Sequence, residues 1–125
     1  MFTINQDNSI FLTRGDIAVI KFSADKRDGS PYIFKDGDIV RFKVFEKRQC
    51  DNVFIKKDVT ISDDTATVDI TLERIDTKIG EIINKPVDYW YEIELNPDTT
   101  PQTLIGYDDD GPKIFRLFPE GGEYN

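Results

Sequence analysis

The chain has 125 residues, of which 12% are aromatic, and its 24 acidic and 16 basic side chains give a net charge of −8. This length fits one domain, and the aromatic content indicates a folded chain, because disordered segments are poor in aromatic residues. The basic residues are scattered among acidic ones, which argues against binding to nucleic acid or to an anionic membrane, since both require clustered lysine and arginine.

The first half of the chain predicts short strands separated by tight turns. Apolar segments favour strands at residues 2–4, 10–12, 17–23, 40–45 and 53–56. In the fourth segment every second residue from Val40 onward is apolar, which is the period of a strand with one buried face. Turn-forming glycine, aspartate and proline residues lie between the strands, at 14–16, 28–31, 36–38 and 62–64.

The second half repeats this pattern around one helical segment. Strands are expected at 68–72, 89–95, 104–107 and 114–118, with turns at 96–98 and 108–112. Residues 74–83 lie between two strongly alternating strands, and we expect there a single helical turn that ends near Gly80.

The two-residue period is typical of antiparallel strands that are buried on one face. We therefore expect an all-β fold, an immunoglobulin-like antiparallel β-sandwich of about seven to nine strands with one short helical turn. Residues 1–119 form the single predicted domain, and 120–125 are expected to be a C-terminal tail. The predicted core consists of Val19, Phe22, Val40, Phe42, Val44, Val68, Ile70, Leu72, Tyr91, Ile93 and Leu95.

Residue types that carry catalysis are scarce. The chain has no histidine, which excludes Ser–His and Cys–His pairs and histidine metal ligands, and its single cysteine, Cys50, excludes an intrachain disulfide. We expect Cys50 to be inert and near a turn. The sequence thus predicts no catalytic residue, no cofactor and no enzyme activity.

The acidic segment 108–110, followed by Gly111, invites comparison with an EF-hand calcium loop. Aligning Gly111 with the invariant glycine places Gly106 at the first ligand position and Leu117 at the last, where a carboxylate is required. The segment therefore favours a solvated hairpin turn, and no metal site is predicted, although a weak cation site of another geometry stays open.

Four aromatic residues are candidates for an interface: Tyr89, Trp90, Phe115 and Phe118. Trp90 falls on the strand face of Glu92 and Glu94, where it either marks a contact surface or is covered by a second layer such as residues 74–83. Residues 114–118 are apolar on both faces, so this strand is either central in a sheet or pressed against a partner. Exposed Tyr89 and Trp90 would also suit a carbohydrate or cell-surface binding module.

Several segments resemble small phage tail-region proteins from prophages of Gram-positive bacteria. The residues that carry this likeness are Leu-Thr-Arg-Gly-Asp at 12–16, Asp-Ile-Val-Arg-Phe-Lys-Val at 38–44, and the stretches 85–98 and 101–107. The order of elements is similar to the N-terminal domain of the phage baseplate upper protein, over about residues 9 to 119 of this chain. Baseplate upper proteins carry further regions after this domain.

The resemblance implies a non-catalytic structural or assembly component of a phage tail or baseplate, acting through protein–protein contacts. Its partners would be other tail or baseplate proteins, with self-association into a homo-oligomer left open. The resemblance implies a location in the virion, assembled in the host bacterial cytoplasm. In agreement with this expectation, residues 1–7 show no signal-peptide pattern and no apolar run is long enough to cross a membrane. The alternative is the carbohydrate or cell-surface binding module.

Overall fold

The computed structural model describes residues 1–26, 28–80 and 83–121. Over these residues the chain forms β1 (Phe2–Ile4), β2 (Ile10–Thr13), β3 (Ala18–Phe22), β4 (Ile39–Glu46), β5 (Gln49–Thr60), β6 (Val68–Leu72), α1 (Arg74–Thr77), β7 (Val87–Leu95), β8 (Gln102–Ile105) and β9 (Lys113–Phe118). The all-β prediction is confirmed. No helix in these ranges is long and apolar enough to cross a membrane.

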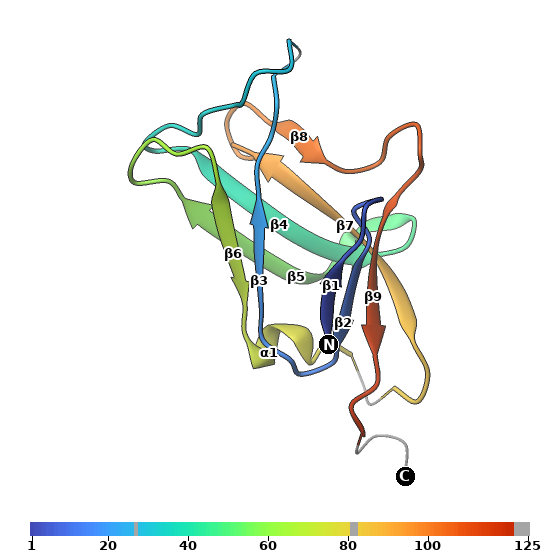
Figure 1. The fold of residues 1–125 in the computed structure, drawn as a ribbon. Coiled ribbons are helices and arrows are strands. Elements are labelled where there is room, and N and C mark those ends of the chain that lie inside the picture. Colours follow the sequence, from blue (N-terminus) through green and yellow to red (C-terminus); the bar gives the residue numbers. More distant parts are fainter. Residues whose placement is uncertain (27, 81–82, 122–125) are drawn as a thin grey trace.

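The strands form two unequal sheets that face each other (Figure 1). The larger has the order β1-β2-β9-β7-β4-β5, with β8 beside β7, and the smaller consists of β3 and β6. In an immunoglobulin-like sandwich, β3 and β6 correspond to strands B and E, and β4, β7 and β9 to strands C, F and G. Within the described residues no strand takes the A or D position beside β3 or β6. One pair, β2 with β9, is parallel, so the larger sheet is mixed and not wholly antiparallel as expected.

The core lies between the two sheets and follows the predicted alternation almost throughout. Phe42 in β4 and Ile93 in β7 pair across the larger sheet, and both are buried. Val19 is the exception: it is 48% exposed, whereas its neighbour Ile20 is 2% exposed. The core prediction was wrong there because residues 17–20 are all apolar and carry no polar residue that fixes which side faces inward.

Two elements differ in length from the prediction. Strand β5 was expected at 53–56 but runs from Gln49 to Thr60, because it pairs with β4 along nearly the whole of that strand. The predicted helical segment is helical only at Arg74–Thr77, where the Glu73 N–H donates to the Asp76 carboxylate at 2.8 Å; residues 81 and 82 lie outside the described residues. Cys50 is exposed and follows the turn at 47–48.

Helix α1 lies near the start of β3, at one end of the small sheet (Figure 1). The Thr77 hydroxyl donates to the Asp16 carbonyl at 2.8 Å and so ties the helix to the β2–β3 connection. Of the predicted tail, Glu120 contacts Arg74 at 3.3 Å and Lys78 at 3.4 Å. Residues 122–125 lie outside the described residues.

Candidate interaction surface

The four aromatic residues predicted as an interface fall on opposite faces of the larger sheet. Tyr89 and Phe115 pair in register and point into the core, where they are 9% and 0% exposed. The prediction that these two residues belong to a surface was therefore wrong. Alternate residues of a strand face the same side, and Tyr89 is two residues before buried Tyr91, so Tyr89 is buried as well. Trp90 and Phe118 lie on the outer face and are half-buried.

Strand β9 is apolar on both faces because it is central in the sheet. It lies between β2 and β7, so both of its edges are paired. Phe115 packs against Phe42 inside the core, at 6.3 Å between ring centroids. On the outer face Phe118 packs against Phe11 of β2, at 5.6 Å. Of the two alternatives that the sequence left open, the structure shows the central strand.

An apolar band crosses the outer face along one line of paired residues. Trp90 in β7 pairs with Phe45 in β4 on one side and with Ile114 in β9 on the other. Tyr107, from the segment that joins β8 to β9, packs against Trp90 with 6.1 Å between ring centroids and is 72% exposed. These four residues, Phe45, Trp90, Tyr107 and Ile114, are called the apolar band below.

Charged residues border the apolar band on the side of the β4 N-terminus. Lys43 lies between two carboxylates, with its Nζ 3.0 Å from Glu92 and 3.6 Å from Glu94. Burial by itself lowers the pKa of Lys43, but the hydrogen bonds and charges of Glu92 and Glu94 outweigh it and the pKa is raised. Lys43 therefore stays charged over the physiological range, and the three groups form a fixed polar row.

A second charged row borders the band on the opposite side. Arg116 donates two hydrogen bonds to Asp88, at 2.6 and 3.1 Å, and its guanidinium lies 5.0 Å from the centroid of the Phe11 ring. The hydrogen bond from Arg116 holds the pKa of Asp88 below its ordinary value, with a smaller contribution from the charge of Lys47. Each charge in the two rows has an opposite charge within 3.6 Å, but Lys43 faces two carboxylates, so the first row keeps a net charge of −1 that a covering partner would meet.

Nothing in the described part of the chain forms a second layer over this outer face. The small sheet lies on the inner side of the larger sheet. Lys57 of β5 is in register with buried Phe42, so its side chain points to the same inner side. Asp76 of α1 pairs with Lys57 at 3.0 Å, and α1 therefore also lies on the inner side. The helix Arg74–Thr77 therefore does not cover Trp90, contrary to one of the two alternatives. An apolar centre with a polar border is the usual anatomy of a protein–protein interface.

The acidic segment forms a turn in which Asp108 is already paired. Its carboxylate accepts a hydrogen bond from the Lys113 Nζ at 2.7 Å and from the Asp110 N–H at 2.9 Å, and Gly111 supplies the positive φ that the turn requires. In the described ranges no group of three or more histidine, cysteine, aspartate or glutamate side chains could hold a metal ion.

Sequence reasoning identified Trp90 but missed the other members of the apolar band. Phe45 lay on the polar side of its strand, Tyr107 was placed in a strand, and Ile114 was considered only as part of β9. The strand registers that bring them together join residues far apart in the chain, which no local pattern reports.

No protein-family model, curated protein sequence or solved structure matches this chain.

Proposed function

We propose that this chain is a non-catalytic interaction domain that docks onto another protein through the apolar band and its charged borders. The observation that carries the proposal is the position of half-buried Trp90 on the outer face, next to half-buried Ile114 and 72% exposed Tyr107. Phe45 on its other side is 7% exposed, and charged residues in ion pairs lie beyond the band on both sides. Tryptophan is enriched at the centre of interfaces, where its truncation costs about 2 kcal/mol or more of binding free energy.

The arrangement of the aromatic rings favours a protein partner over a sugar. A carbohydrate site built on Tyr89 and Trp90 would need both rings on one face, but Tyr89 points into the core. The Tyr107 ring is inclined by 63° to the Trp90 ring, so these two do not form a flat platform for a sugar ring.

We further propose that the assembly is a phage tail or baseplate, with this chain as a structural component of the virion. The likeness of residues 12–16, 38–44, 85–98 and 101–107 to tail-region proteins supports this assignment. The immunoglobulin-like sandwich agrees with it, since such sandwiches serve many proteins as docking units without catalytic groups.

Mass spectrometry of purified virions tests the assignment. We expect the chain among the tail proteins, at a fixed ratio to the other tail components. A Trp90→Ala variant should fail to enter the particle, because the loss of about 2 kcal/mol weakens docking by about 30-fold.

The matched control is Ile75→Ala, which removes an 81% exposed apolar residue from α1, away from the apolar band. It should enter particles like the parent chain, and both variants should keep a cooperative melting transition, which shows that they are folded. Absence of the parent chain from purified virions, or equal incorporation of the two variants, would contradict the proposal.

A further inference from the structure

A pocket of about 300 Å³ lies where the turn between β4 and β5 meets the beginning of β7, and it is called the hairpin pocket below. Its lining consists of Glu46, Lys47, Phe54, Val87, Asp88 and Tyr89. The pairing of β4 with β5 shifts register on both sides of Phe45, and such bulges redirect side chains and are frequent beside active sites. A cavity of about 150 Å³ holds a benzene molecule, so the hairpin pocket has room for one long side chain.

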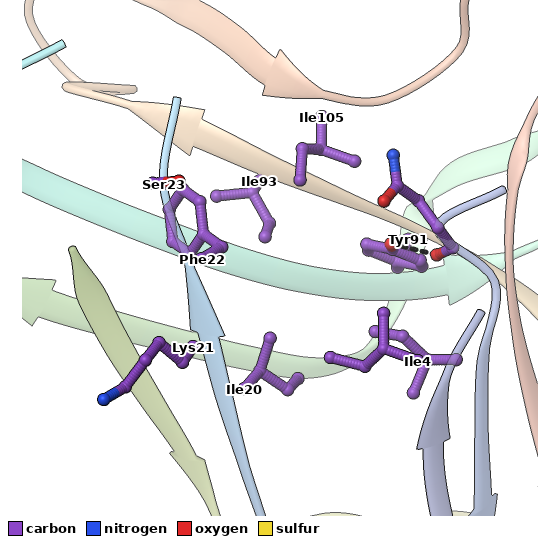
Figure 2. Close-up of a pocket in the computed structure, with 10 residues that line it drawn as sticks. Ile4, Ile20, Lys21, Phe22, Ser23, Tyr91, Ile93 and Ile105 are labelled. Atoms are coloured by element: carbon purple, nitrogen blue, oxygen red, sulfur yellow. Dashed lines mark hydrogen bonds between the residues drawn. The ribbon is translucent and has the colours of Figure 1, made fainter. Parts of the chain in front are cut away.

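A second cavity, of about 220 Å³ beside β3, offers no comparable polar group. Figure 2 shows apolar side chains such as Ile4 and Ile93 around its space, with Lys21 directed away from it. The hydroxyl of Tyr91, which also lines this cavity, already donates to the Asn8 carbonyl. Its lining therefore does not single out a ligand, whereas the lining of the hairpin pocket does.

Glu46 is the charged group of the hairpin pocket that lacks an opposite charge. Asp88 accepts two hydrogen bonds from Arg116, at 2.6 and 3.1 Å, and the Lys47 Nζ lies 3.9 Å from it. The Glu46 carboxylate accepts a hydrogen bond from the Asn52 side-chain amide, and no lysine or arginine of the described residues lies within ion-pair distance of it. A carboxylate has about four acceptor positions, so Glu46 can still receive further donors.

Two aromatic rings line the pocket together with this carboxylate. The rings of Phe54 and Tyr89 pack edge to face, with 5.0 Å between their centroids. Burial raises the pKa of Tyr89, the charge of Arg14 lowers it, and the charge of Glu46 raises it, which shows that Glu46 lies near this ring. Arg14 is not part of the lining and donates to the Ile79 carbonyl at 3.3 Å. A carboxylate beside aromatic rings is a setting that attracts a cation.

We propose that the hairpin pocket binds the guanidinium group of an arginine side chain from the protein that docks onto the apolar band, an inference that rests on the docking function proposed above. The guanidinium donates to Glu46, and its plane and stem pack against Phe54 and Val87. A guanidinium suits the site better than an ammonium, because it is planar, more weakly hydrated and stacks on aromatic rings. Asp88 belongs both to this lining and to the charged row beside the apolar band, so one partner can cover both.

A blocked tripeptide with arginine between two glycines is a suitable probe. Amide NMR titration should show saturable shifts at residues 46, 54 and 87–89. The same peptide with citrulline, which has nearly the same shape but no charge, should bind at least about tenfold more weakly, since hydrogen bonds between charged groups are the stronger ones. The lysine peptide should also bind more weakly than the arginine peptide.

In the protein, Glu46→Gln keeps an acceptor for the Asn52 amide and removes only the charge, and it should weaken binding of the arginine peptide by about tenfold or more. The matched control is Asp63→Asn, which removes the same charge beyond the opposite end of β5 and should leave the affinity unchanged. Trp90→Ala should bind the peptide normally. Peptide binding together with absence of the chain from virions would therefore contradict the proposed function and leave this site standing.

Four results would overturn the inference. They are no shifts at the hairpin pocket, equal binding of the arginine and citrulline peptides, tighter binding of the lysine peptide, and equal losses in Glu46→Gln and Asp63→Asn. Free arginine is the other source of a guanidinium, and its carboxylate would need Lys47. Free arginine that binds more tightly than the blocked peptide, and loses this advantage in Lys47→Gln, would show that the ligand is an amino acid and would also overturn it.

Discussion

Truncating Phe42 to alanine tests the central assignment of the fold, that alternate residues of β4 face a core shared by both sheets. Phe42 is 0% exposed, and its ring lies 5.6 Å from that of Tyr91 and 6.3 Å from that of Phe115. Removing a buried phenylalanine costs about 3–5 kcal/mol, and the two ring contacts place this site near about 4–5 kcal/mol. The free energy of unfolding of such a domain is about 5–15 kcal/mol, so the loss is a large part of the whole.

The assay is thermal unfolding followed by circular dichroism. Unfolding entropy is about 2.1 cal/mol/K per residue, or about 0.26 kcal/mol/K for this chain, so the melting temperature should fall by about 15–19 °C. The control is Asp69→Ala in β6. The Asp69 carboxylate is exposed, and its ion pair with Lys21 is long, at 3.9 Å, and therefore weak. This substitution should shift the melting temperature by less than about 4 °C. Equal shifts in the two variants would refute the assignment of inner and outer faces.

Three further perturbations have defined outcomes. Asp88→Asn should destabilise the protein by about 0.5–1 kcal/mol at pH 7. Urea titrations should show this difference beginning to fall near about pH 4, the ordinary pKa of an aspartate, and vanishing only once the pH has dropped below the lowered pKa that Asp88 has in the folded protein. Tyr91→Phe should cost about 1 kcal/mol in the same assay, because the Tyr91 hydroxyl donates to the Asn8 carbonyl. Gly37→Ala should cost about 1–2 kcal/mol, and Gly37→Asn less, because φ is +93° there and asparagine tolerates that region better; equal costs would contradict this reasoning.

The alternation of apolar and polar residues predicted the core wherever charged residues interrupt it. In β4, Arg41 and Lys43 fix which side of the strand faces the solvent, and Val40, Phe42 and Val44 are buried as predicted. In β3 the four residues 17–20 are all apolar, so the pattern does not distinguish the sides, and Val19 was assigned to the wrong one. The period of two is informative only where both classes of residue occur.

The candidate sites depended on pairings that a local pattern cannot report. Trp90 was recognisable as an outward aromatic residue, but its neighbours Phe45 and Ile114 join it only through the registers of β4 and β9 with β7. Tyr89 could have been excluded from the surface by extending the alternation back from Tyr91. The pairing of β2 with β9, which places the β1–β2 hairpin in the larger sheet, joins segments about 100 residues apart.

The parallel pairing of β2 with β9 has a mechanical consequence. Residues Ile10–Thr13 run beside Phe115–Phe118 in the same direction, so the beginning of β2 and the end of β9 lie at opposite ends of the pair. Tension applied through these two strands would pull along the ladder and strain all of its hydrogen bonds together, whereas the antiparallel β1–β2 hairpin would open one bond at a time. A stretched molecule should therefore give way first at the hairpin and then resist at this shear-loaded pair, whose rupture force single-molecule pulling can measure.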